Sequence, residues 1–195
     1  MTGGSLSDRE RWDAKHAGAG TGADGPDRPE KPEAFVLRAL ALVPFSRGAR
    51  ALDLAAGRGR HALELARRGY EVAAWDVSPV GLAILAERVA ELGLEIETRV
   101  LDLLTESLPE DMEFDLVLVA NFLDRPLYRR LSGLVRPGGH LVLTTFTTDR
   151  VGKTPSARHC LAPGELARGL EGFETLLAEE VGGRAGMLGR RLAVQ

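Results

Sequence analysis

The sequence predicts an α/β protein built on a doubly wound, mostly parallel sheet, and three observations lead to that class. Short apolar runs alternate with helix-length segments along most of the chain, as in βαβ units. Runs such as residues 116–119 are continuously apolar, which is typical of strands covered by helices on both faces. The last two apolar runs are separated by about seven residues, too few for a crossover helix, so we expect an antiparallel hairpin there.

The beginning of the chain differs in composition from the rest. Residues 7–17 can form a short helix, and residues 18–32 are rich in Gly, Pro and Asp with almost nothing to bury. We therefore predict a flexible N-terminal segment with a short helix over residues 1–31. One folded domain is predicted over residues 32–195, because the chain length and a hydrophobic content of 44% suit a single core.

The elements of that domain follow in order. A helix is expected to begin at Pro32, which suits a first helical turn. Ser78 can cap the helix that opens at Pro79, and Gly69 and Gly93 can end the two helices that precede them. The predicted strands are residues 49–54, 71–75, 95–100, 115–120, 141–146, 174–180 and 187–194. The predicted helices between them are residues 59–68, 79–92, 126–135 and 163–170.

Charge and cysteine content exclude several classes. The net charge is −3 and no run of five or more Lys or Arg occurs, so we expect no groove that follows a nucleic-acid backbone. The single cysteine, Cys160, excludes an internal disulfide and a cysteine zinc cluster, and it fits a reducing, cytoplasmic location. No window has about 18 apolar residues and the start of the chain lacks a leader pattern, so we expect no membrane association and no secretion.

The main functional signal is a glycine turn between two strands. Residues 51–60 read Ala-Leu-Asp-Leu-Ala-Ala-Gly-Arg-Gly-Arg, and a second strand after the next helix ends in Asp76. Glycine lets the backbone approach a ligand closely and adopt positive φ without steric cost. A carboxylate at the end of the second strand can accept hydrogen bonds from both hydroxyls of a ribose. The pattern predicts a nucleoside-cofactor site, although Asp76 is also placed to interact with a helix dipole.

The spacing within the turn bears on which nucleoside binds. A dinucleotide site needs the spacing G-x-G-x-x-G with a helix N-terminus directed at the pyrophosphate. Here Asp53 precedes a turn of the form Ala55-x-Gly57-x-Gly59, and a carboxylate there would repel a pyrophosphate. S-adenosylmethionine has no phosphate and carries an ammonium and a sulfonium. The turn therefore favours S-adenosylmethionine over a nicotinamide dinucleotide.

Residues 53–59 resemble the first motif of class I S-adenosylmethionine-dependent methyltransferases, with Ala55 in place of its first glycine. Matching motifs follow in the family's order over about residues 32–195. They are Asp76 after strand two, Asp102-Leu103 after strand three, Phe114-Asp115 with Asn121-Phe122 around strand four, and residues 134–139 before strand five. The resemblance implies a Rossmann-like sheet of seven strands, in the order 3-2-1-4-5-7-6 with strand 7 antiparallel and helices on both faces.

The resemblance also implies S-adenosylmethionine as cofactor and a set of binding residues. The backbone of the two glycines would meet the methionine portion, and Asp76 the ribose. Asp102 would meet the adenine amine, unless it is an ordinary solvated loop acid. The residues expected at the cofactor are Asp53, Ala55, Gly57, Gly59, Asp76, Val77, Asp102, Leu103, Asn121 and Trp12.

Three further segments look like the small bacterial tellurite-resistance-type methyltransferases: residues 11–15, 121–128 and 163–166. In those enzymes the N-terminal segment is a lid, which implies that residues 1–31 form a lid here and that Trp12 covers the ligand. His16 and His159 lie in segments near the expected mouth of the site and are interpreted as surface residues or substrate contacts.

The segment after strand four bears on the methyl acceptor. Enzymes that methylate amino groups of adenine or glutamine place Asn/Asp-Pro-Pro-aromatic there, whereas residues 121–124 read Asn-Phe-Leu-Asp. We expect a small-molecule acceptor, such as a chalcogen oxyanion or a thiol. Transfer would be in line and driven by alignment and desolvation. We assign no catalytic base and no metal. The candidate substrate residues are His61, Phe122, Asp124, Arg125 and Tyr128.

Alternatives remain open from the sequence. Arg125 can attract an oxyanion and Tyr128 can close over it, but both, with Asp124, can equally cap and pack the helix that begins there. The same residues are compatible with a non-catalytic protein that binds S-adenosylmethionine, since a fold can persist without its activity. A nicotinamide-dependent oxidoreductase is the less favoured third hypothesis. Both a monomer and a homodimer are compatible with the sequence.

Overall fold

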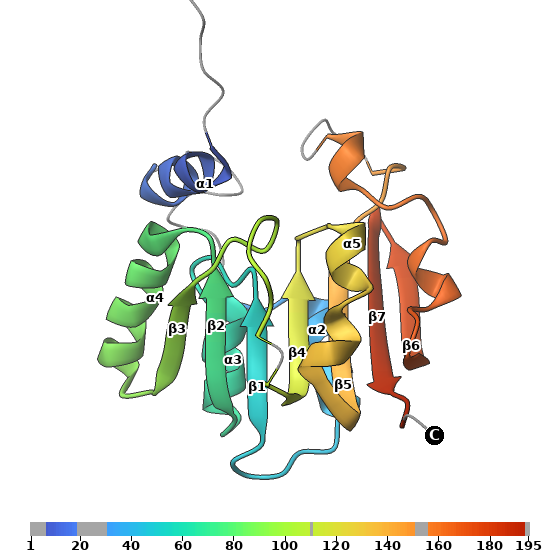
Figure 1. Cartoon of the computed structure of the whole chain (residues 1–195), viewed down its shortest axis with the longest axis horizontal. Helices are drawn as coiled ribbons and strands as arrows, with labels where there is room; N and C mark the ends of the chain where they lie inside the picture. The colour runs from blue at the N-terminus through green and yellow to red at the C-terminus, as the bar shows by residue number, and fades with distance from the viewer. Residues whose placement is uncertain (1–6, 19–30, 110, 151–155, 194–195) are drawn as a thin grey trace, which may run out of the picture.

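The computed structural model describes residues 7–18, 31–109, 111–150 and 156–193. Its centre is one seven-stranded sheet in the order β3-β2-β1-β4-β5-β7-β6 (Figure 1). The first five strands pair in parallel, and β7 is antiparallel to both of its neighbours. The predicted strand order and the antiparallel strand 7 are confirmed. The strands are β1 (Arg50–Leu54), β2 (Glu71–Asp76), β3 (Ile96–Val100), β4 (Phe114–Ala120), β5 (Val135–Phe146), β6 (Phe173–Val181) and β7 (Arg184–Arg191).

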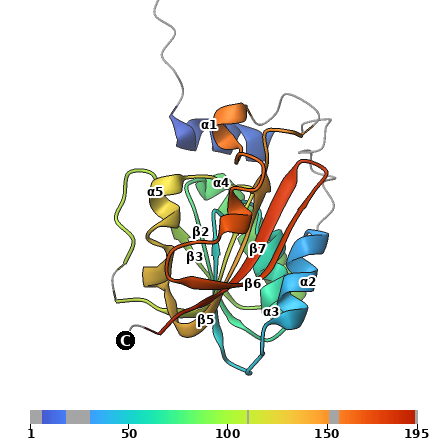
Figure 2. The same cartoon turned by 90° about the vertical axis from the view of Figure 1, so that its right-hand side faces the viewer.

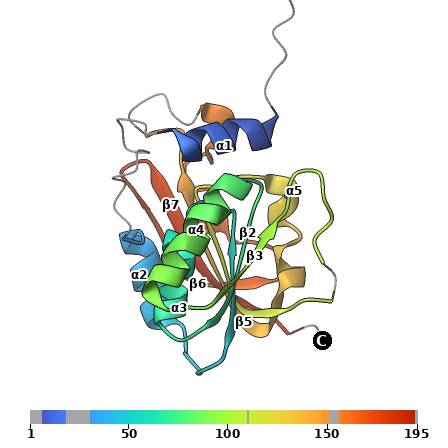
Figure 3. The same ribbon diagram turned by 90° about the vertical axis from the view of Figure 1, so that its left-hand side faces the viewer.

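Helices cover both faces of this sheet, as predicted (Figures 2 and 3). The longer helices α2, α3 and α4 pack on one face, and the short helix α5 and the turn η1 pack on the other. The helix α1 lies outside both layers. The α-helices are α1 (Asp8–Ala17), α2 (Ala34–Leu42), α3 (Arg60–Arg67), α4 (Pro79–Leu92) and α5 (Arg125–Tyr128), and the 3-10 turns are η1 (Leu131–Leu134), η2 (Ala157–His159) and η3 (Leu166–Arg168).

The strands divide their side chains between two apolar cores. In β4, Leu116 and Leu118 face the core under α2 and α3, whereas Val117 and Val119 face the core under α5. All four side chains are fully buried. This alternation follows from the two-residue period of a strand, and burial on both faces explains why the segment is continuously apolar.

Two predicted helices are much shorter in the structure. The helix predicted over residues 126–135 is the single turn α5 followed by η1, because Ser132 and Gly133 are weak helix formers and Val135 already pairs with Phe114 of β4. The helix predicted over residues 163–170 reduces to η3. Gly164 and Gly169 on either side of η3 adopt positive φ, which is incompatible with a continuous helix.

The C-terminal hairpin is tighter than predicted. The strand β7 begins at Arg184, three residues before the predicted start, so only Gly182 and Gly183 connect it to β6. Both glycines have positive φ, as a two-residue turn between twisted strands requires. The strand was predicted to begin too late because Gly186 is a residue type that is common in loops. It lies within β7 instead, where a Cβ would come within 2.6 Å of the Phe35 ring of α2.

The N-terminal helix α1 is confirmed near its predicted bounds. Ser7 and Glu10 form a reciprocal capping box at its start. The expectation of flexibility concerns residues 1–6 and 19–30, which lie outside the described residues. Within the ranges that the structure describes, no helix has the length and apolar content needed to cross a membrane.

Candidate cofactor site

The glycine turn lies at the carboxyl ends of the parallel strands, where β1 separates the two halves of the sheet. In open α/β sheets this is the edge at which ligands bind. Three residues of the turn adopt the left-handed conformation: Ala55 with φ of 58°, Gly57 with 56° and Gly59 with 73°. Ala55 thus keeps the backbone geometry of a glycine even though it carries a Cβ.

Asp76 ends β2 and connects directly to this turn. Its Oδ2 accepts a hydrogen bond from the Gly57 N–H at 2.7 Å, and its Oδ1 accepts one from the Ser78 N–H at 2.8 Å. Burial raises the pKa of Asp76, and the two backbone donors act in the opposite direction. Each carboxylate oxygen has a second lone pair. The side chain can therefore hold the turn and still accept from ligand hydroxyls.

Asp53 has a different position from the one its place in the motif suggested. Asp53 is 1% exposed and its Oδ2 accepts from the Ala62 N–H at 2.9 Å, so it ties β1 to the first turn of α3. Burial raises the pKa of Asp53 to about 7, while the hydrogen bond from Ala62 lowers it. Its repulsion of a pyrophosphate is accordingly weaker than that of a fully ionised, exposed carboxylate.

This raised pKa makes stability depend on pH. The unfolded carboxyl titrates near 4, so the neutral form is favoured in the folded state. The stability that the neutral carboxyl contributes is fully present below about pH 4 and is lost as the pH rises through about 7. We expect Asp53→Asn to flatten the fall in unfolding free energy over this range. Urea unfolding from pH 4 to 8 measures it, with Asp115→Asn at a half-buried position as control. An unchanged slope in Asp53→Asn would contradict the prediction.

The predicted adenine residues follow β2 and β3. The two strand ends are joined where the Leu101 N–H donates to the Asp76 carbonyl at 2.9 Å. Leu103 is buried and Val77 is half-buried. The Asp102 Oδ1 accepts from the Leu104 N–H at 2.9 Å, and the Asp102 N–H donates to Glu106 Oε1 at 2.8 Å. Asp102 therefore stabilises its own loop, and contact with a ligand stays a prediction.

The helix α1 lies across the carboxyl edge, over the N-terminus of α4 (Figures 1 and 3). The Asp13 carboxylate accepts from the Ser78 hydroxyl and, at 3.5 Å, from the Val80 N–H. The Arg58 guanidinium donates to the His16 carbonyl. The N-terminal segment thus contacts the glycine turn, the exit of β2 and the start of α4.

Within α1, His16 rather than Trp12 contacts the glycine turn. A Cβ built on Gly57 would lie 3.3 Å from His16 Cε1, and one on Gly81 would lie 3.1 Å from His16 Cδ2. Burial lowers the pKa of His16. Trp12 stacks on this imidazole, with 5.9 Å between the ring centroids, and is 36% exposed. The four-residue spacing of the two rings, which places them on one helix face, was the available sequence signal.

The candidate substrate residues have structural partners. The Asp124 Oδ1 accepts from the Leu127 N–H at 2.6 Å and caps α5, and the buried Tyr128 hydroxyl donates to the Phe122 carbonyl at 2.6 Å. Arg125 forms two hydrogen bonds to Glu165, at 2.6 and 2.8 Å. His61 is 4% exposed on α3. Capping and packing describe Asp124 and Tyr128 here, and their contact with an acceptor stays a prediction.

Asn121 follows β4 and also has positive φ, at 60°. Its side chain amide donates to Glu33, a residue that sequence reasoning did not single out. Arg60 and Arg184 bind the same carboxylate and were likewise missed. These side chains come from distant parts of the chain, so no local pattern linked them.

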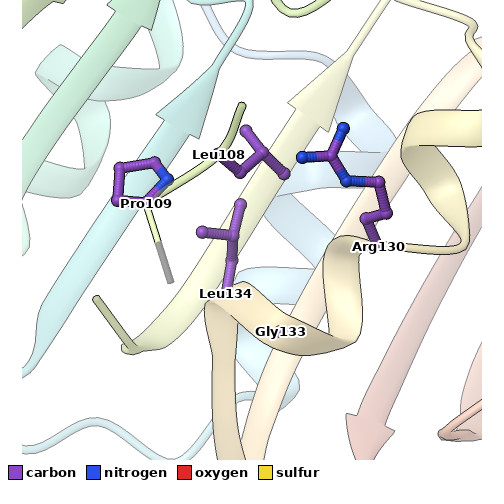
Figure 4. Close-up of a pocket in the computed structure, with 5 residues that line it drawn as sticks. All are labelled: Leu108, Pro109, Arg130, Gly133 and Leu134. Carbon is purple, nitrogen blue, oxygen red and sulfur yellow. The ribbon is translucent and has the colours of Figure 1, made fainter. Parts of the chain in front are cut away.

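A hollow lies elsewhere, between the loop after β3 and η1 (Figure 4). Its lining residues are Leu108, Pro109, Arg130, Gly133 and Leu134. None of them belongs to the glycine turn or to the residues directly after β1, β2 or β4. In the described part of the chain, no group of three or more His, Cys, Asp or Glu side chains is arranged to hold a metal ion.

A sheet of this strand order, with a left-handed glycine turn after β1 and a buried acid at the end of β2, has the class I methyltransferase fold. A family model described as "Methyltransferase domain" matches residues 51–139. Residues 51–139 are therefore similar to a methyltransferase domain, on the fold of S-adenosylmethionine-dependent methyltransferases.

Curated relatives and solved structures agree. A ubiquinone biosynthesis O-methyltransferase of Xanthomonas axonopodis pv. citri is 29% identical over 143 residues, which are 69% of this chain and 57% of that protein. The probable S-adenosyl-L-methionine-dependent methyltransferase TehB of Haemophilus influenzae is 30% identical over 106 residues, 51% of this chain and 37% of that protein. The chain thus matches less than two thirds of the length of either relative.

Two crystal structures show the similarity of fold. TehB from Haemophilus influenzae superimposes with a TM-score of 0.66 and 24% identity, over 80% of this chain and 61% of that chain. A methyltransferase from Aquifex aeolicus gives a TM-score of 0.68 and 20% identity, over 96% of this chain and 100% of that chain.

Proposed function

We propose that this protein transfers a methyl group from S-adenosylmethionine to a small-molecule acceptor. The observation that carries the proposal is the buried Asp76 carboxylate bonded to the backbone of the glycine turn. This arrangement presents a preorganised acceptor pair beside backbone that a ligand can approach closely. Relatives named as O-methyltransferases support a small acceptor.

The residues present fit the cofactor by the chemistry of their donor and acceptor atoms. The free lone pairs of Asp76 suit a ribose diol, and Val77 with Leu103 offers apolar surface for adenine. Asp102 would accept from the adenine amine. The turn that contains Gly57 and Gly59, with Asn121 at the exit of β4, would hold the methionine end. Asp53 would support this turn by anchoring β1 to α3, and Ala55 would support it as a residue of the turn itself.

When bound, the cofactor supplies a methyl group on a sulfonium, which is already an activated leaving group. The chain then has to orient an acceptor in line and exclude water. A base is needed only for an acceptor that must lose a proton. Arg125 is paired with Glu165 and could bind an oxyanion only after this ion pair opens. Oxyanions and thiols therefore both remain candidate acceptors.

We further propose that α1 acts as a lid on the nucleoside half of the site. Asp13 and His16 anchor it on residues that surround Asp76. We expect Asp13→Ala to speed deuterium exchange of the α1 amides, because it removes the acceptor shared by Ser78 and Val80. The control is Asp8→Ala, whose ion pair with Arg11 stays within α1. Equal exchange in Asp13→Ala and the wild type would refute the anchoring role.

The function is tested by ligand selectivity and by turnover. S-adenosylhomocysteine should raise the melting temperature, whereas NAD should not. A screen that follows labelled methyl groups from S-adenosylmethionine into thiols, phenols and chalcogen oxyanions should then yield a product. Stabilisation by NAD alone would favour the oxidoreductase hypothesis. Tight S-adenosylhomocysteine binding without product across the screen would favour a non-catalytic binding protein.

A further inference from the structure

Four side chains from separate segments meet at the carboxylate of Glu33, the residue that directly precedes α2. Glu33 Oε1 accepts from Asn121 Nδ2 at 2.7 Å and from the guanidinium of Arg60. Glu33 Oε2 accepts from the Thr144 hydroxyl at 3.2 Å and from the guanidinium of Arg184. We call these five residues the Glu33 network. Its members lie between 27 and 151 positions from Glu33.

The network joins two backbone segments of the candidate site. Arg60 is the first residue of α3 and directly follows Gly59 of the glycine turn. Asn121 is the first residue after β4. These two segments are the ones proposed to hold the methionine end of the cofactor. Glu33 therefore fixes the relative position of both sides of that half of the site.

Three hydrogen bonds hold Asn121 in the left-handed conformation. Its φ of 60° lies in the left-handed region, which Asn tolerates better than most residues but less readily than glycine. Its N–H donates to the Thr144 carbonyl at 2.8 Å, and its Oδ1 accepts from Arg184 at 2.7 Å. A strained residue persists where its surroundings over-determine its conformation, and such residues gather at ligand sites.

The charges around Glu33 argue against a role as general base. Its side chain is 15% exposed, and those of Arg60 and Arg184 are 17% and 33% exposed. Burial raises the pKa of Glu33, but the two guanidinium groups outweigh it and leave the pKa below its usual value. The carboxylate is therefore ionised at neutral pH and unsuited to serve as a general base.

We propose that Glu33 is a positioning residue that holds Asn121 and the first turn of α3 in the geometry that receives the methionine end of the cofactor. This inference rests on the proposed function. It separates the site into a nucleoside half governed by Asp76 and a methionine half governed by the Glu33 network.

Two ligands distinguish positioning from general support of the fold. S-adenosylhomocysteine carries the amino-acid moiety, and methylthioadenosine keeps the nucleoside and sulfur but lacks that moiety. We expect Glu33→Gln to weaken binding of S-adenosylhomocysteine about tenfold, roughly the loss of one charge-assisted hydrogen bond. Binding of methylthioadenosine should stay within about twofold of the wild type. Calorimetric titration of the full chain measures both.

The matched control is Glu179→Gln, which removes an exposed ion pair between Glu179 and Arg38 of α2. It should leave both affinities unchanged. Arg184→Lys keeps the charge but loses the planar fork that bridges Glu33 and Asn121, so it should reproduce the selective loss even if Glu33→Gln folds poorly.

The outcomes distinguish failure of the positioning role from failure of the proposed function. Equal weakening of both ligands in Glu33→Gln and Arg184→Lys, or no weakening of either, would overturn the positioning role. Failure of the wild-type protein to bind S-adenosylhomocysteine would overturn the proposed function itself. Selective loss of S-adenosylhomocysteine binding supports both.

Discussion

Replacement of Asp76 by alanine is expected to weaken S-adenosylhomocysteine binding by at least about 100-fold. A carboxylate that accepts from two ribose hydroxyls makes two charge-assisted hydrogen bonds, each contributing roughly 1.5 kcal/mol or more. Their joint loss of about 3 kcal/mol corresponds to a factor above 100 in the dissociation constant. Displacement of the Gly57 and Ser78 donors adds to the loss, because the turn is no longer held. Calorimetric titration gives the affinity directly.

The control for this change is Asp115→Ala. Asp115 lies in β4 and binds the Arg50 N–H and Arg136, away from the glycine turn. It should bind S-adenosylhomocysteine as the wild type does. Asp76→Asn, which retains the shape of the side chain, should be weakened less than Asp76→Ala and guards against a folding defect. Wild-type affinity in Asp76→Ala, with the protein folded by circular dichroism, would rule out the assigned role.

Gly59→Ala is expected to lower the free energy of unfolding by about 3 kcal/mol. At φ of 73° a Cβ costs roughly 1–2 kcal/mol. The added atom would also lie 2.2 Å from Leu85 Cδ1, within a fully buried side chain, and overpacking of this kind costs roughly 1–3 kcal/mol. Gly59 thus permits α4 to pack directly against the turn, in addition to giving a ligand access. Urea denaturation measures the effect.

The structure offers a matched comparison at Gly93. Its φ of 62° is similar, but a Cβ there would meet nothing within 4 Å. Gly93→Ala should therefore cost only the backbone strain, about 1–2 kcal/mol. Equal losses in the two variants would show that contact with Leu85 contributes nothing and that the close packing at Gly59 has been misjudged.

The strands could be located because periodicity is local information. The order of the strands in the sheet was implied by the resemblance to a known family. Boundaries failed where local signals conflicted with tertiary pairing. Gly186 suggested a loop yet lies in β7 against Phe35, and Val135 was predicted to be helical yet begins β5, where it pairs with β4.

Part of the site could be predicted because its residues belong to one local sequence motif. Asp76 and the glycine turn are adjacent in the motif and in space. The burial of Asp53 depends on how α3 covers it. The contact of His16 with the glycine turn depends on how α1 packs against the domain. Glu33 was missed because its partners are brought together only by the folded sheet, at separations of up to 151 residues. Long-range polar clusters of this kind leave no periodic trace in the sequence.

The most direct test of the account is a crystal structure of the full chain with S-adenosylhomocysteine. We expect both ribose hydroxyls within about 3 Å of the Asp76 carboxylate, a hydrogen-bonding distance. The amino-acid end should lie between the glycine turn and Asn121, with α1 over the nucleoside. A ligand bound away from Asp76, or with its amino-acid end directed away from the Glu33 network, would contradict the assignment of this edge as the methyl-transfer site.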